Sequence, residues 1–178
     1  MKKAFFIVAI AMAVNSVAFG DTEKQQDSNV EVVWQSPEDY TDVRPANQSR
    51  KRFMEQTFNR LEKHFTKLAK RLPEDYQWQL TVTDLDLAGQ VWPASFVGFG
   101  QGGQDVRLIK DIDIPRMTFS YQLISDGKTL KQADVELKDM GFLHKSLRGS
   151  DSDPLRYEKR MLNEWFAEEF ADQIIAKK

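Results

Sequence analysis

The chain has 178 residues, no cysteine and a formal net charge of −2, from 25 basic and 27 acidic side chains. This length suits one domain with one hydrophobic core. A composition of 41% hydrophobic and 29% charged residues is that of a globular protein rather than a disordered one. The lack of cysteine excludes disulfides, a cysteine nucleophile and thiolate metal ligands. The slight excess of acidic groups argues against a dedicated nucleic-acid-binding protein.

The first 20 residues are typical of a cleavable export signal. Lys2 and Lys3 precede an apolar run over 4–14. This run is shorter than the roughly 20 residues that a membrane-spanning helix needs. Ala18 and Gly20 then supply the small side chains that precede a signal cleavage site.

We therefore expect a signal peptide at 1–20, cleaved between Gly20 and Asp21, a polar leader at 21–29 and a single domain at 30–178. The mature protein would be periplasmic or secreted, without a transmembrane segment. An uncleaved N-terminal anchor is the alternative.

Apolar side chains recur every three or four residues between 50 and 72, which predicts an amphipathic helix capped by Asn47 or Ser49. The stripe consists of Met54, Phe58, Leu61, Phe65, Leu68 and Leu72. The polar face of this helix carries eight basic and two acidic side chains, a net charge of +6.

A second helix is predicted to begin with Asp153 as its cap and Pro154 in its first turn, and to run to about residue 175. The segment 151–172 carries seven acidic and three basic side chains, a net charge of −4.

Four segments have the β-branched composition or the two-residue alternation of strands: 30–34, 77–87, 117–123 and 133–137. In the second of them the apolar positions change phase, which predicts a bulge near Thr83 and Asp84. Asp126 and Gly127 predict a type I′ turn that joins the last two strands into a hairpin.

Between these strands, 88–105 is expected to be a long glycine-rich loop, and 106–114 an edge strand that ends at Pro115. The fold class is therefore α+β. We expect one two-layer domain, with a mainly antiparallel sheet of four to five strands and two amphipathic helices on one face. The first strand can join this sheet in parallel through the first helix.

The opposite charges of the two helices have two interpretations. The helices can lie side by side and form ion pairs across their shared rim, which is the interpretation we favour. Alternatively, the basic face binds an anionic partner, such as lipid headgroups or an acidic protein. The basic residues that would make such a contact include Arg52, Arg60, Lys63 and Lys67.

Four aspartates lie in the similar settings TDLDL and KDIDI: Asp84, Asp86, Asp111 and Asp113. If their strands are neighbours, the carboxylates can cluster for acid–base chemistry or for binding a hard cation. Otherwise they occupy the solvent face of strands whose Leu and Ile point inward, which we favour. The two histidines, His64 and His144, have no metal-site companion at a suitable spacing and are expected at the surface or rim.

The glycine-rich segment contains three aromatic rings, Trp92, Phe96 and Phe99. They either pack onto the core or line a binding contact. The glycines match no phosphate-binding motif, and no serine lies in a nucleophile motif. We therefore expect no cofactor and identify no catalytic residue.

Five segments together resemble one bacterial family, domain of unknown function 3016. They are PEDYTDVR (37–44), VTDLDLAGQVWP (82–93), VRLIKDIDIPRMTFSYQL (106–123), DGK (126–128) and DPLRYEKRMLNEWFAEEF (153–170). The resemblance covers about 30–172 and implies an exported or envelope protein of proteobacteria. It implies no activity and no catalytic residue.

The sequence therefore favours a non-enzymatic envelope protein with a binding or assembly role. One alternative is a hydrolase or metal-binding protein that uses the four aspartates. Another is a peripheral protein that binds anionic lipid through the basic helix.

Overall fold

The structure is a computed structural model that describes residues 29–98, 103–145 and 152–174. The expected signal peptide at 1–20, nearly all of the expected leader, and Phe99 lie outside the described residues.

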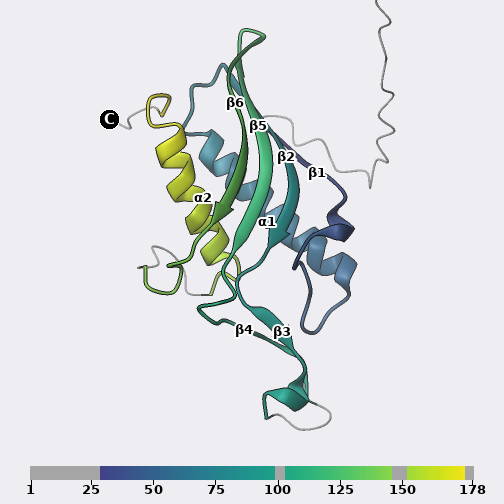
Figure 1. Cartoon of the computed structure of the whole chain (residues 1–178). Helices are drawn as coiled ribbons and strands as arrows, with labels where there is room; N and C mark the ends of the chain where they lie inside the picture. Colours follow the sequence, from purple (N-terminus) through teal and green to yellow (C-terminus); the bar gives the residue numbers. More distant parts are fainter. Residues whose placement is uncertain (1–28, 99–102, 146–151, 175–178) are drawn as a thin grey trace, which may run out of the picture.

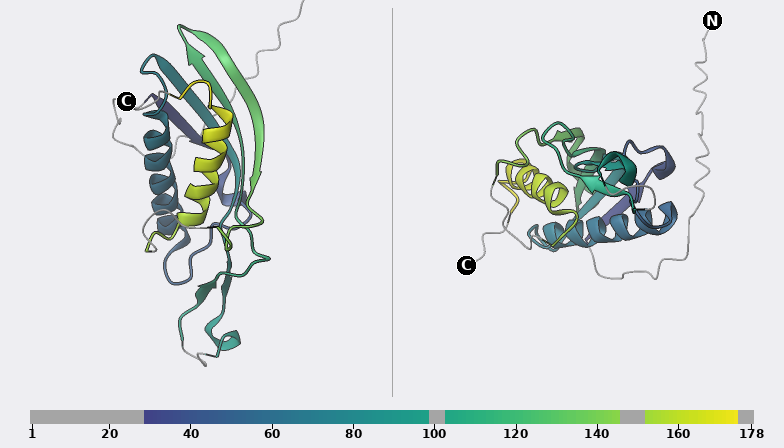
Figure 2. Two further views of the ribbon diagram at one scale, coloured as in Figure 1. Left: turned by 90° about the vertical axis from the view of Figure 1, so that its left-hand side faces the viewer. Right: turned by 90° about the horizontal axis from the view of Figure 1, so that it is seen from below.

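A mixed four-stranded sheet has the strand order β1-β2-β5-β6 (Figure 1). The strands are β1 Val30–Trp34, β2 Tyr76–Asp86, β5 Arg116–Ser125 and β6 Lys128–Lys138. β1 pairs with β2 in parallel, and the other two pairings are antiparallel. Two helices cover one face of this sheet (Figure 2), so the predicted α+β class is confirmed.

Helix α1, Arg50–Ala69, provides the crossover that makes the parallel β1–β2 pairing possible. The Ser49 hydroxyl accepts a hydrogen bond from the Arg52 backbone N–H at 3.4 Å and caps its first turn. Leu61, Phe65 and Leu68 of the predicted apolar stripe are buried against the sheet.

Helix α2 spans Arg156–Glu169, so both of its predicted ends are wrong. The Asp153 carboxylate does accept a hydrogen bond from the Leu155 backbone N–H at 3.0 Å, but this bond closes a turn that precedes the helix. At the other end, Phe170 is fully buried in the core, and the chain continues as a turn instead of the helix expected to residue 175.

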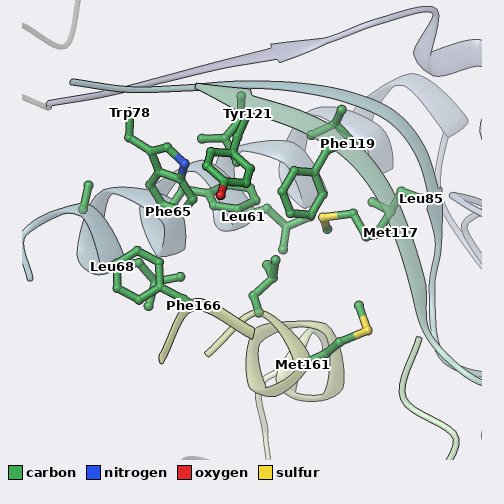
Figure 3. Packing of buried hydrophobic residues seen from close by; sticks show 14 of the residues in the cluster. Leu61, Phe65, Leu68, Trp78, Leu85, Met117, Phe119, Tyr121, Met161 and Phe166 are labelled. Atoms are coloured by element: carbon green, nitrogen blue, oxygen red, sulfur yellow. The ribbon is translucent and has the colours of Figure 1, made fainter. Parts of the chain in front are cut away.

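The core is centred on Trp78 of β2, whose side chain is 0% exposed (Figure 3). Its indole lies 5.7 Å from the ring of Phe65 in α1, centroid to centroid. It lies 5.3 Å from Phe166 in α2 and 5.5 Å from Phe170 just after it. Trp78 therefore joins the sheet to both helices.

The other face of the sheet is not covered by a helix (Figure 2). Alternate positions of β2 and β5 point to this side, and apart from Ile124, which pairs with Gln77, the central ones are polar: Gln77, Gln79, Thr81, Thr118, Ser120 and Gln122. The domain thus has two layers, as expected for an antiparallel sheet with one wet face.

Two local predictions are confirmed. The pairing of β2 with β5 shifts register between Val82 and Asp84, which is the predicted bulge. The β5–β6 hairpin turns at Asp126 and Gly127, with φ of 50° and 70°, as a type I′ turn requires.

The segment between β2 and β5 differs from prediction. The expected edge strand over 106–114 shrinks to β4, Val106–Leu108, because the chain then turns at Lys110, whose C=O accepts a bond from the Asp113 N–H at 3.2 Å. β4 pairs with β3, Gln90–Trp92, which lies in the expected loop. Together they form a two-stranded ribbon that projects from the domain (Figure 1).

Gly89 permits the ribbon to leave the sheet. Its φ is +78°, and a Cβ there would lie 2.3 Å from the carbonyl oxygen of Leu108. A larger residue would therefore require both a left-handed backbone and a shift of β4.

Candidate functional site

The outward face of α1 is a strip of basic side chains. Seven of them are exposed, against one exposed carboxylate, Glu55. They are Arg50, Lys51, Arg52, Arg60, Lys63, Lys67 and Lys70, the last at the C-cap; Arg50, in the first turn, lies outside the strip and donates a hydrogen bond to the Glu38 carbonyl. At 1.5 Å per residue, the strip from Arg52 to Lys70 is about 27 Å long.

Within the described residues, no lysine or arginine of α1 forms an ion pair. The favoured prediction, that the two helices pair across their rim, is therefore wrong for this part of the chain. Arg60 acts on Asp153 through its charge alone, adding to the hydrogen bonds from Lys159 and the Leu155 N–H that hold the pKa of this carboxyl low. The half-buried Glu62 of α1 accepts a hydrogen bond from Trp34 Nε1 at 2.7 Å.

The carboxylates of the second helix segment have other partners. Asp153 pairs with Lys159 of α2 at 2.6 Å, and Glu164 pairs with Lys145 at 2.6 Å. Glu169 binds Lys131 of β6 at 2.7 Å. Three carboxylates of this segment are therefore paired with lysines outside α1, and the positive charge of α1 stays exposed.

A histidine, rather than ion pairs, occupies the contact between the helices. His64, expected at the surface or rim, is half-buried at the edge of this contact, beside Lys159 and Asn163 of α2. Its Nε2 atom is buried without a hydrogen-bond partner. Burial, helped by the charges of Lys159 and Lys67, lowers the pKa of His64 to about 4. The imidazole is therefore neutral at pH 7.

This burial makes stability depend on pH. His64 takes up a proton at about pH 6.5 in the unfolded chain but only at about pH 4 in the fold. The free energy of unfolding should thus decrease as the pH is lowered from about 6.5 to about 4, by up to about 3 kcal/mol from this group. We expect His64→Leu to lose this part of the pH dependence in urea titrations. His144→Gln, at an exposed position, is the control, and equal pH profiles for all three proteins would contradict the assignment.

The ribbon is fixed to the domain by Arg107 of β4. Its guanidinium donates hydrogen bonds to Asp42 Oδ2 at 2.9 Å, to the Gly89 carbonyl at 2.8 Å and to the Arg44 carbonyl at 2.9 Å. This side chain is only 19% exposed. The VRL strand pattern gave no indication of its role, because the partners are up to 65 residues away in sequence.

The ribbon does not gather the candidate aromatic residues into one contact. Trp92 is half-buried under the ammonium of Lys110, which lies 3.9 Å from the ring centroid. Phe96 is 76% exposed. Of these two rings, Trp92 therefore packs against Lys110 and Phe96 faces solvent.

Removal of the Arg107 side chain should loosen the ribbon. Arg107→Ala leaves a carboxylate and two carbonyls without their donor, so we expect a loss of about 2–4 kcal/mol in the free energy of unfolding. Arg116→Ala is the matched control, because Arg116 is 47% exposed and pairs with one carboxylate, Asp86, among the described residues. It should cost at most about 1 kcal/mol. Equal losses in the two variants would refute the anchoring role.

The four aspartates have separate environments. Asp84 accepts hydrogen bonds from the Thr41 N–H and hydroxyl at 2.7 and 2.8 Å. Asp86 binds Arg116 at 2.8 Å, and burial raises its pKa. Asp111 is exposed, whereas Asp113 has a buried Oδ2 without a hydrogen-bond partner. In the described ranges, no group of three or more His, Asp or Glu residues can hold a metal ion, so the four do not form a ligand set.

Sequence reasoning missed a buried acid, Glu158 of α2, which is 1% exposed. Its Oε1 accepts a hydrogen bond from the Ala88 N–H at 2.8 Å, and its Oε2 has no hydrogen-bond partner. Burial raises the pKa of this carboxyl. Glu158 is three residues before Met161 and four before Leu162, so helical periodicity places it on the apolar stripe. This spacing is the sequence signal that could have indicated its burial. Glu158 holds the start of the ribbon segment against α2.

None of the helices in the described part of the chain has the length and apolar character needed to cross a bilayer. The structure thus defines a two-layer α+β protein with a projecting ribbon and one strongly basic helix face. Residues 28–168 match the family described as "Protein of unknown function (DUF3016)". This is most of the chain, which therefore belongs to that family, as its motifs indicated. No curated protein and no solved structure matches it.

Proposed function

We propose that this is an exported, non-enzymatic binding protein of the periplasm, and that the basic face of α1 is its binding surface. The observation that carries the proposal is that acidic side chains of the α2 segment form ion pairs and basic side chains of α1 form none among the described residues. Asp153, Glu164 and Glu169, in and just before α2, form ion pairs within the domain, whereas no α1 cation has a carboxylate partner among the described residues.

An array of cations is suited to binding where a single cation is not. One exposed ion pair contributes only about 0–1 kcal/mol. Several cations on one face act together on a polyanion and also accelerate its encounter. The protein has a net negative charge overall, so an anionic partner would be attracted to this face and repelled elsewhere.

The hydrolase or metal-binding alternative has less support. Asp84 is bound by Thr41 and Asp86 by Arg116, so these two carboxylates have separate structural contacts. Nothing in the described residues brings them around a common point.

Export is tested by the N-terminus of the protein in cells. We expect the periplasmic fraction to contain a chain that begins at Asp21, as read by N-terminal sequencing. Ala18→Glu with Gly20→Glu should retain the longer chain, because the cleavage site needs small side chains. Recovery of an intact N-terminus from the cytoplasm would overturn this part of the proposal.

Binding is tested by retention of the protein on immobilised heparin, a soluble polyanion, and by the salt concentration that elutes it. We expect Lys63→Gln with Lys67→Gln to elute at clearly lower salt, because salt screens such contacts. Lys128→Gln with Lys138→Gln removes the same charge from exposed positions of β6 and should leave elution unchanged. Circular dichroism verifies that both variants fold. Equal shifts for the two pairs would mean that overall charge, not α1, governs retention.

A further inference from the structure

We propose that the partner of the α1 strip is the surface of a bilayer that contains anionic phospholipids, with α1 lying along it. This inference rests on the proposed function and names its partner. The test below separates a failure of the lipid assignment from a failure of the binding role.

The shape of the strip suits an extended partner. Its cations lie along one straight helix, with the uncharged Gln56 and Asn59 among them. The depression beside its C-terminal end is lined by Lys70 but also by the carboxylates of Glu31 and Glu74. Such a lining would repel a small anion. The strip therefore fits a surface that presents many anionic groups without fixed spacing.

The position of α1 gives a flat surface access to the strip. Figure 2 shows α1 along one side of the molecule, with its N-terminal half extending past α2. The guanidinium of Arg71 lies 5.1 Å from the Phe166 ring centroid, so the C-terminal parts of the two helices are neighbours. The exposed Glu168 and Asp172 follow Phe166. A bilayer therefore meets the cations nearer the start of α1 without these carboxylates.

The mode of contact is adsorption rather than insertion. The apolar stripe of α1 is committed to the core, where Leu61, Phe65 and Leu68 are at most 2% exposed. It is not available for the acyl region, unlike that of an interfacial amphipathic helix. Attraction to anionic headgroups then supplies the affinity, at about 1 kcal/mol for each Lys or Arg near the surface.

The strip is less suited to single-stranded nucleic acid. Sequence-tolerant binding of that kind combines a basic groove with aromatic side chains on which bases stack. The aromatic side chains of α1 are buried or half-buried: Phe53, Phe58 and Phe65. None of them stands beside the exposed cations as a stacking platform.

The experiment is co-sedimentation of the full chain, purified after expression with its own N-terminus, with vesicles. One set is phosphatidylcholine, and the other contains about one third phosphatidylglycerol. We expect binding only to the anionic set, and its loss between about 0.1 and 1 M salt. Lys63→Gln with Lys67→Gln should lower the partition coefficient about 30-fold. Lys128→Gln with Lys138→Gln should leave it unchanged.

Each other outcome overturns the inference in a recognisable way. Equal binding to both vesicle sets, or binding that salt does not weaken, would mean that apolar contact causes the binding. The apolar run over 4–14 of unprocessed chains could make such a contact. Absence of vesicle binding, with heparin retention that still depends on Lys63 and Lys67, would leave the binding role intact and make the partner a soluble polyanion. Failure of both assays would remove the binding role as well.

Discussion

The arrangement of the domain depends on the contact between Trp78 and the two helices. The indole belongs to the third residue of β2 and meets Phe65 of α1 as well as Phe166 and Phe170 at the end of α2. Aromatic contacts of this kind dominate core energetics. They also set the rotation of α1 about its axis: because Phe65 faces the sheet, the cations on the opposite side of the helix must face solvent.

The distribution of charge follows from the same packing. The contact between α1 and α2 is made by side chains such as His64, which leaves little room there for ion pairs between the helices. Lys131 and Lys145 instead approach the acidic helix from β6 and from the segment after it. An almost neutral sequence thus folds into a molecule with one basic side, which composition alone does not reveal.

Features that depend on neighbouring residues were predictable. The α1 stripe, the Ser49 cap, the bulge between Val82 and Asp84 and the Asp126 turn each result from local spacing or backbone preference. Features that depend on distant partners were not. The early end of β4, the clamp of Arg107 on Asp42 and the absence of ion pairs between the described parts of the helices are all decided by tertiary packing. The basic face was foreseen residue by residue, whereas its lack of neutralising partners required the fold.

The uncovered face of the sheet has a practical consequence. Its polar side chains contact neither helix, and the chain contains no cysteine. Gln122, exposed in the middle of β5, is therefore a position where a single engineered thiol would be unique in the molecule and remote from the helix layer. A fluorophore or spin label attached there would report how the domain is oriented at a surface without altering the surface that makes the contact.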